Sequence, residues 1–136
     1  MTVPILMFHD VIEEIGGPWH ITVENFRNIL ELLLENGYSP ISFQQLVDFV
    51  DGKGKLPEKP VCITLDDGYY SNYKTVLPIA NELKVPITVF MNGKTVRKPN
   101  ESLSINPNIV SKMNVDELKT LATSPYATVQ SHSYGL

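Results

Sequence analysis

The sequence of 136 residues has little of what marks disulfide-rich, membrane-spanning or exported proteins. Cys62 is the only cysteine, so no disulfide can form within the chain. No apolar run approaches the ~20 residues that a membrane-spanning helix needs. The first residues lack the basic region and long apolar stretch of a signal peptide, which predicts either a cytoplasmic protein or a chain without its leader.

An excess of positive charge is also absent. The net charge is −4, with 11 Lys and Arg against 15 Asp and Glu, which argues against a nucleic-acid partner because phosphate backbones attract basic surfaces. Hydrophobic residues make up 43% and charged residues 19%, as in an ordinary globular protein. The length predicts one domain with a sizeable core.

Residues 61–65 form an apolar, β-branched run that predicts a buried strand. The run ends in two adjacent carboxylates, Asp66 and Asp67, and then Gly68. Two carboxylates side by side repel each other unless a cation or a proton lies between them. Asp-Asp-Gly is also a good turn sequence, and a plain turn is the simpler explanation of this pattern taken alone.

A second strand, predicted over residues 127–131, ends in His132. A lone histidine after a strand is more often structural than a ligand. If both strands are parallel, however, Asp66, Asp67 and His132 all lie at the same edge of the sheet, where barrel enzymes hold their catalytic groups. Two carboxylates and a histidine are the beginning of a metal-assisted hydrolase site.

Strands and helices alternate along the chain. Strands are predicted over residues 3–8, 40–42, 61–65, 86–91 and 127–131, and helices over residues 22–35, 43–50, 71–83 and 114–121. Thr22 and the Asn114-x-x-Glu117 pattern are expected to cap two of the helices, and Pro78 to interrupt a third. In the second helix Leu46, Val47 and Val50 are expected to face inward. This order predicts an α/β fold with a parallel sheet that can curl into a barrel.

The segment 63–69, Ile-Thr-Leu-Asp-Asp-Gly-Tyr, resembles the first signature of the polysaccharide deacetylase family, also called the NodB-like domain or carbohydrate esterase family four. That signature is usually Thr-Phe-Asp-Asp-Gly, and Leu65 stands at the Phe position. Residues 131–133 resemble the start of the second signature, His-Ser/Thr-x-x-His. Residues 3–9 are similar to the Met-Tyr-His start of one branch, so the resemblance covers almost the whole chain.

The resemblance implies a distorted (β/α) barrel with fewer than eight strands, of which this chain supplies the first five. Residues 1–136 would then be the N-terminal portion of a single deacetylase domain. The second histidine of the family pattern falls at Leu136. Three later signatures, which carry an Arg, an Asp-Trp pair and a Leu-x-His, are absent from the sequence.

The resemblance also implies a function. Family members remove N-acetyl, and sometimes O-acetyl, groups from sugar polymers with zinc or another divalent metal, and many act outside the cell or in its envelope. They are hydrolases of carbon–nitrogen bonds other than peptide bonds. By this resemblance Asp66 is the general base, and Asp67 and His132 are metal ligands. Because catalytic zinc usually has three protein ligands, the chain is expected to bind zinc weakly and to hydrolyse poorly or not at all.

Four further residues are weaker candidates for binding the polysaccharide. His9 ends the first strand, at the same edge as Asp66, although a partly buried structural histidine would look the same. Trp19 can stack on a sugar or merely cover the core. Tyr69 and Tyr70 follow the Asp pair and can line a saccharide groove.

Other interpretations remain open at this stage. The chain can be a non-catalytic carbohydrate-binding remnant of a deacetylase, or an unrelated α/β protein whose Asp pair binds magnesium for phosphoryl chemistry. Lys94, Arg97 and Lys98 are interpreted as a solvated loop, with contact to an acidic glycan as the alternative. The strand over residues 127–131 would be an open edge, which predicts self-association.

Overall fold

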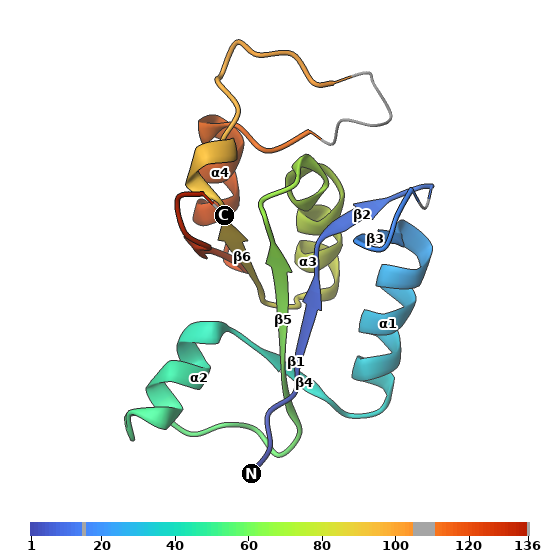
Figure 1. Ribbon diagram of the computed structural model, residues 1–136. Coiled ribbons are helices and arrows are strands. Elements are labelled where there is room, and N and C mark those ends of the chain that lie inside the picture. Colours follow the sequence, from blue (N-terminus) through green and yellow to red (C-terminus); the bar gives the residue numbers. More distant parts are fainter. Residues whose placement is uncertain (15, 105–110, 136) are drawn as a thin grey trace.

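The computed structural model describes residues 1–14, 16–104 and 111–135, and its centre is a parallel sheet (Figure 1). Five strands form this sheet in the described part of the chain: β1 (Ile5–Phe8), β4 (Ser39–Ile41), β5 (Pro60–Asp66), β6 (Ile87–Met91) and β7 (Ala127–Ser131). They lie in the order β1-β5-β6-β7, and β4 pairs with the first half of β5. The predicted parallel sheet of five strands is therefore confirmed.

Helices cross between the strands. They are α1 (Val23–Glu35), α2 (Phe43–Val50), α3 (Leu77–Leu83) and α4 (Val115–Thr123), with a π-helical turn (Asn72–Val76) before α3 and a 3-10 turn (Gly93–Thr95) after β6. A small parallel sheet of β2 (Asp10–Ile12) and β3 (His20–Thr22), which the sequence pattern did not predict, follows β1. Among the described residues, no helix is both long and apolar enough to cross a membrane.

Side-chain caps begin two helices where the sequence predicted them. The Thr22 hydroxyl accepts a hydrogen bond from the Asn25 N–H at the start of α1, over 3.1 Å. Asn114 and Glu117 form the predicted capping box of α4, in which each side chain accepts from the other residue's N–H. Caps satisfy N–H groups that the first turn of a helix leaves unpaired, so local sequence is enough to place these boundaries.

The segment after β5 differs from the expected single helix over residues 71–83. It starts as a π-helical turn and becomes a regular helix at Leu77. Pro78 lies in the first turn of α3, directly after the π-helical turn, and has no N–H to continue the hydrogen bonds of that turn. The interruption predicted at Pro78 is present: the π-helical turn changes to a regular α-helix at Leu77, next to the proline.

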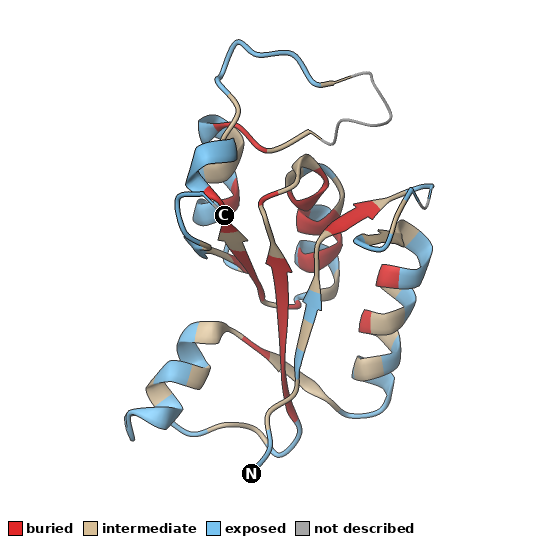
Figure 2. Cartoon of the chain, viewed as in Figure 1, coloured by how far each residue is buried: buried red, intermediate tan, exposed pale blue. Residues whose placement is uncertain are grey.

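Strand β5 is the buried centre of the sheet. Every residue from Pro60 to Leu65 is buried, and Asp66 is the first that is partly exposed (Figure 2). The strand is hydrogen-bonded to β1 on one side and to β6 on the other. A parallel strand buried on both faces is expected to be largely apolar, and Thr64 is the one polar residue in this buried stretch.

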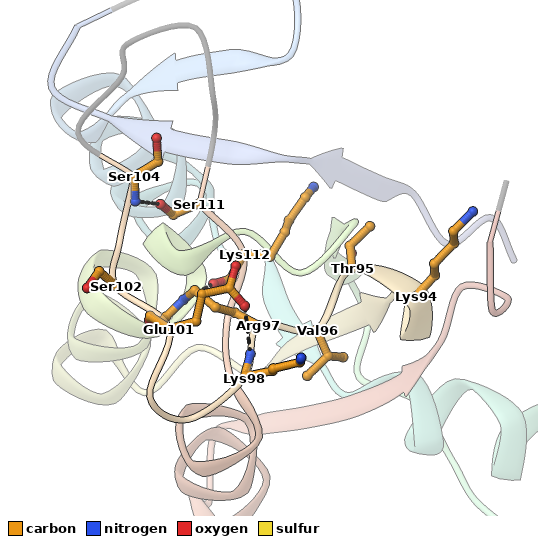
Figure 3. Close-up of a pocket in the computed structure, with 10 residues that line it drawn as sticks. All are labelled: Lys94, Thr95, Val96, Arg97, Lys98, Glu101, Ser102, Ser104, Ser111 and Lys112. Atoms are coloured by element: carbon orange, nitrogen blue, oxygen red, sulfur yellow. Dashed lines mark hydrogen bonds between the residues drawn. The ribbon is translucent and has the colours of Figure 1, made fainter.

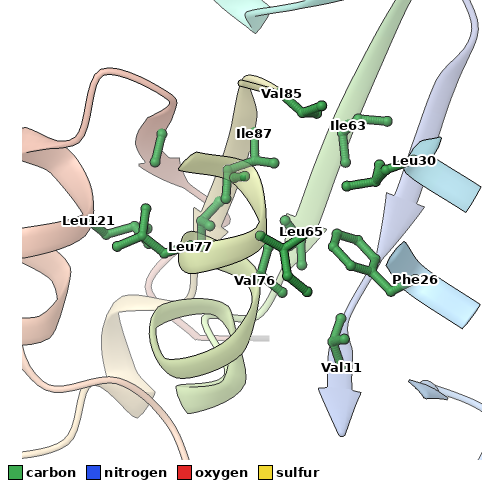
Figure 4. Close-up of a cluster of buried hydrophobic side chains, with 14 of the residues drawn as sticks. Val11, Phe26, Leu30, Ile63, Leu65, Val76, Leu77, Val85, Ile87 and Leu121 are labelled. Atoms are coloured by element: carbon green, nitrogen blue, oxygen red, sulfur yellow. The ribbon is translucent and has the colours of Figure 1, made fainter. Parts of the chain in front are cut away.

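The two faces of the sheet have different chemistry. Ile63 and Leu65 point to one face, where they belong to the same apolar cluster as Phe26 and Leu30 of α1 (Figure 4). This cluster also takes in buried residues of α3, β6 and α4, such as Leu121. The helix-covered face of the sheet is therefore the hydrophobic core.

The opposite face carries polar side chains. Thr64, Thr88 and Thr128 lie level with one another on β5, β6 and β7, and the Thr128 hydroxyl donates to the Thr88 hydroxyl over 3.1 Å. Side chains alternate between faces along a strand, so Asp66, two residues beyond Thr64, lies on this polar face. The Asp66 carboxylate therefore lies on the same face as the threonines and nearer to the carboxyl edge of the sheet.

The orientation of helix α2 differs from the sequence prediction. Val47 and Val50 do not face inward: they are 40% and 75% exposed, and no residue of α2 is buried (Figure 2). The helix lies apart from α1 and α3 (Figure 1) and contacts the sheet through Phe43, whose ring centroid is 5.5 Å from that of Phe90. Phe90 is on the polar face of β6, so α2 has no part in the core cluster.

The turn after β5 needs a glycine for two reasons. Gly68 has φ +68, a left-handed conformation that costs other residues free energy. A Cβ on Gly68 would also lie 1.8 Å from Sδ of Met91, which is buried in β6. The turn therefore packs its backbone directly against the neighbouring strand.

Helix α1 offers a matched pair of leucines that tests the position of the core. Leu30 is 1% exposed and Leu32 is 60% exposed. We expect Leu30→Ala to lower the free energy of unfolding by about 2–5 kcal/mol, because it leaves a cavity. Leu32→Ala should change it by less than ~0.5 kcal/mol. Denaturant titration of both variants measures this, and equal losses would contradict the assignment of the core face.

Gly68 and Gly37 provide a second matched pair. Both have positive φ, but a Cβ on Gly37 meets no atom within 4 Å. Gly37→Ala should cost only the backbone strain of about 1–2 kcal/mol. Gly68→Ala must also displace Met91, which should add roughly 1–3 kcal/mol. Because Met91 is itself buried, its truncation has its own cost, so the addition should shrink only when Gly68→Ala is compared with Met91→Ala alone in the Met91→Ala background. Thermal melts of the two glycine variants, Met91→Ala and the double variant decide this, and equal losses for the two glycines would contradict the close approach.

Candidate active site

Three predicted site residues meet at the carboxyl edge of the sheet. Asp66 is the last residue of β5, Asp67 follows it, and His132 follows β7. The Asp67 N–H donates to the Phe90 carbonyl over 2.9 Å, and the His132 N–H donates to the Met91 carbonyl over 2.8 Å. Backbone bonds to β6 thus hold both segments beside the same strand.

The His132 side chain lies within ion-pair distance of both carboxylates. His132 Nε2 is 3.5 Å from Asp67 Oδ1 and 3.8 Å from Asp66 Oδ2. The three side chains are 35%, 29% and 16% exposed in the order His132, Asp67, Asp66, so each can be reached from solvent. The sequence prediction that these residues lie together agrees with the geometry.

The spacing fits part of a metal site. Two ligands that each lie about 2.0–2.2 Å from one tetrahedral cation are separated by roughly 3.3–3.6 Å, and Asp67 Oδ1 and His132 Nε2 have that separation. In residues 1–14, 16–104 and 111–135, no group of three or more His, Cys, Asp or Glu side chains could hold a metal ion. Position 136, where the family pattern has its second histidine, lies outside the described residues. The described chain therefore offers two donors at ligand spacing.

Left-handed backbone is concentrated here. Asp67 has φ 73, and Ser133, which follows His132, also has φ 73. Such a conformation costs a non-glycine residue about 1–2 kcal/mol and persists where the surroundings impose it, often at functional sites. Both candidate ligands thus lie at turns that direct the chain away from the strand.

Tyr69 lies between the carboxylates and a lysine. The Lys112 ammonium is 3.4 Å from the centroid of the Tyr69 ring, and the two residues form a backbone bridge. Burial raises the pKa of Tyr69, and the negative charges of Asp67 and Asp10 raise it further. Burial lowers the pKa of Lys112, against the opposing effect of the same two carboxylates. Tyr69 therefore stays a neutral phenol, in the electrostatic field of Asp67.

Tyr70 lies in a different environment from Tyr69. Its ring is 6.1 Å from that of Tyr73 and 5.9 Å from both Lys74 Nζ and Arg97 Cζ. Its N–H donates to the Ser111 carbonyl over 2.9 Å. These contacts hold Tyr70 within a cluster of aromatic and cationic side chains.

His9 and Trp19 form a pair at the same edge of the sheet. Phe8 of β1 pairs with Leu65 of β5, so His9 lies level with Asp66. The ring centroids of His9 and Trp19 are 4.8 Å apart, and Trp19 is 59% exposed. Within the described residues, no hydrogen bond or ion pair joins this pair to Asp66, Asp67 or His132.

A buried polar network, which sequence reasoning missed, lies behind His9. The carboxylate of Asp10 is 2% exposed and accepts from the Ser71 hydroxyl over 2.6 Å, and that hydroxyl accepts from the Val11 N–H over 3.0 Å. The second oxygen of Asp10 lies 3.6 Å from Nε2 of His20. Nδ1 of His20 accepts from the Gly16 N–H, which leaves the ring proton on Nε2, facing Asp10.

Asn72 extends this network to the backbone of His9. Its Nδ2 donates to the His9 carbonyl over 3.0 Å, and its Oδ1 is buried without a partner in the described structure. Asp10 adjoins His9 in sequence, and Ser71 and Asn72 closely follow the Asp-Asp-Gly signature. The closeness of these residues to the two motifs was the only sequence signal for the network, because its hydrogen-bond partners are about 60 residues apart in the chain.

Comparison with proteins of known sequence finds related deacetylases. YxkH of Bacillus subtilis, assigned by name to the polysaccharide deacetylases, is 31% identical over 93 residues, which are 68% of this chain and 33% of that protein. The poly-β-1,6-N-acetyl-D-glucosamine N-deacetylase of Escherichia coli is 28% identical over 135 residues, 95% of this chain and 20% of that protein. The chain therefore spans a third or less of the length of these relatives.

Solved structures agree with the fold. A de-N-acetylase from Aggregatibacter actinomycetemcomitans superposes with a TM-score of 0.84 at 26% identity, over 98% of this chain and 55% of that one. IcaB from Ammonifex degensii gives a TM-score of 0.82 at 25% identity, over 97% and 53%. The expected α/β fold of the deacetylase type is thus confirmed, over about half the length of those structures.

The family model for polysaccharide deacetylases matches residues 53–136, which include both signature segments. This match covers more than half of the chain and agrees with the sequence relatives and with the fold. The chain belongs to the polysaccharide deacetylase family.

Proposed function

We propose that this chain carries the general base and two metal ligands of an enzyme that hydrolyses the N-acetyl, and in some substrates the O-acetyl, groups of a carbohydrate polymer. The observation that supports this most directly is the convergence of Asp66, Asp67 and His132, with His132 Nε2 at 3.5 and 3.8 Å from the two carboxylates. Family membership supports the reaction class, a hydrolysis of carbon–nitrogen bonds other than peptide bonds.

The proposed roles divide the two carboxylates. Asp67 and His132 would hold zinc or another divalent cation, which supplies a Lewis acid for the acetyl carbonyl. Asp66 would accept the proton of the water that attacks the acetyl carbon, since its carboxylate ends β5 and is partly exposed. The backbone bonds of Asp67 and His132 to β6 hold both ligands in place before substrate arrives.

The proposed substrate is an N-acetylated polysaccharide. Trp19 is exposed beside His9, and an exposed indole offers a flat apolar surface to the face of a sugar ring. Tyr69 lies close to the Asp pair and adds a phenol hydroxyl for sugar contacts. The Escherichia coli relative, named for poly-β-1,6-N-acetyl-D-glucosamine, supports a polymer that contains N-acetylglucosamine as the substrate class.

Carbohydrate binding without catalysis is the second candidate. It is favoured by the presence of only two donors at ligand spacing in the described residues, together with the exposed Trp19. A chelator separates the two functions. Glycan binding that survives both the chelator and Asp66→Ala would favour the binding function.

Removal of either proposed ligand should weaken metal binding. We expect Asp67→Asn and His132→Gln each to lower zinc affinity by on the order of tenfold or more, because loss of an outer partner of a ligand alone costs about 10–100-fold. Calorimetric titration with zinc and with magnesium measures this, and zinc should be preferred. Asp116→Asn, in the exposed first turn of α4, is the matched control and should bind zinc as the unmodified chain does. Unchanged zinc affinity in both ligand variants would refute the proposed site.

The Asp66→Asn variant tests whether Asp66 acts as the general base and not as a metal ligand. We expect its zinc affinity to stay within about threefold of the unmodified chain, whereas any zinc-dependent release of acetate that the unmodified chain shows from an N-acetylglucosamine tetramer should fall to background. Calorimetry and an acetate assay on the same preparation measure the two effects. A tenfold loss of zinc affinity in this variant would instead make Asp66 a ligand.

A further inference from the structure

A second concave site lies beside the Asp pair, in the segment between β6 and α4. It is a cavity of about 550 Å³, within the usual ~300–1,000 Å³ of ligand sites, and Figure 3 shows the ten residues that line it. Nine of the ten lining residues are polar or charged, and Val96 is the exception. The family comparison and the proposed catalytic residues leave this cavity unassigned.

The charge of the cavity is opposite to that of the whole chain. Lys94, Arg97, Lys98 and Lys112 line it, and Glu101 is the carboxylate in its wall. The chain as a whole has a net charge of −4. Glu117 pairs with Arg97 and Glu101 offsets part of the charge, but three lysines remain around the cavity, and their positive potential favours an anion.

The Arg97 side chain forms part of the cavity wall, and protein partners already occupy its N–H groups. Its side chain is 9% exposed and pairs with Glu117 over 2.8 Å. It also donates to the backbone carbonyls of Lys112, over 3.1 Å, and Glu101. These bonds fix the position of Lys112 relative to the rest of the lining (Figure 3).

The three lysines differ from Arg97 in this respect. In the part of the chain that the structure describes, no ion pair involves the ammonium groups of Lys94, Lys98 or Lys112. Lys112 is partly buried, and burial lowers its pKa. The Lys112 ammonium lies over the Tyr69 ring, and an anion bound in the cavity would add a charged partner for the three lysines.

Lys112 connects the cavity to the catalytic edge. Its ammonium lies over Tyr69, two residues after Asp67. On either side of Lys112, the Met113 N–H donates to the Gly68 carbonyl over 3.0 Å and the Ser111 carbonyl accepts from Tyr70. The cavity is therefore joined, through Lys112 and its two neighbours, to the segment that directly follows the Asp pair.

We propose that this cavity binds a carboxylate carried by a sugar near the one that is deacetylated, so that the substrate is an acidic N-acetylated polysaccharide. This inference rests on the proposed deacetylase function and specifies its substrate. Glu101 in the wall offsets one of the cations and favours a single negative charge over a polyanion. The hydroxyls of Ser102 and Ser111, also in the lining, suit the remaining polar groups of a sugar.

Two tetrasaccharides test the proposal on the full chain with zinc. The neutral probe is the tetramer of N-acetylglucosamine, and the acidic probe is a hyaluronan tetramer, in which N-acetylglucosamine alternates with glucuronate. We expect the acidic tetramer to bind at least about tenfold more tightly by calorimetry at low salt, with the preference falling as salt screens the lysines. The Lys94→Gln/Lys98→Gln double variant should lose the preference and bind the neutral tetramer unchanged.

Controls separate this proposal from the one on which it rests. Lys53→Gln/Lys55→Gln, in the exposed loop after α2, removes the same charge elsewhere and should keep the preference. Trp19→Ala should weaken both tetramers equally. Equal affinity of the two tetramers for the unmodified chain, or a preference that survives in the Lys94/Lys98 variant, would overturn the carboxylate site alone. Failure of both tetramers to bind would overturn the proposed function as well.

Discussion

Strand β5 is hydrogen-bonded to β1 on one side and to β6 on the other, and the register of these pairings determines which side chain lies on which face. In the observed register Ile63 and Leu65 enter the core, while Thr64 and Asp66 lie on the polar face. A slip of one residue would place Asp66 in the apolar cluster and Leu65 at the site, because side chains alternate along a strand. The apolar core opposes such a slip, and the position of the Asp66 carboxylate therefore depends on the burial of its neighbours.

The same sheet positions the groups around the Asp pair. His9 follows β1 and His132 follows β7, and the parallel direction of these strands brings their ends to one edge. Gly68 allows the turn after β5 to lie against Met91, and Asp67 accepts a left-handed backbone in that turn. Core packing and backbone bonds to β6 thus hold a strained loop in place, so that its carboxylates need little rearrangement when a ligand binds.

The surroundings of the Asp pair differ on its two sides. Towards β1 lie His9 and the exposed Trp19, which offer a surface for a sugar ring. Towards the segment after β6 lie Lys112 and the basic cavity, which offer charge. Because β1 and β6 flank β5, the proposed polysaccharide substrate, laid across this edge, would meet the aromatic surface on one side of the Asp pair and the cationic cavity on the other.

Local patterns in the sequence determined much of this protein. They include the apolar run of β5 with Asp66 and Asp67 at its end, the caps at Thr22 and Asn114, and the signatures that identify the family. Each depends on residues within a few positions of one another, so the chain itself carries the signal. Tertiary structure alone decided that α2 lies outside the core, that Ser71 holds Asp10 and that Lys112 lies over Tyr69. These contacts join residues some 40–60 positions apart, and side-chain types that are common everywhere acquire such roles only when the sheet brings them together.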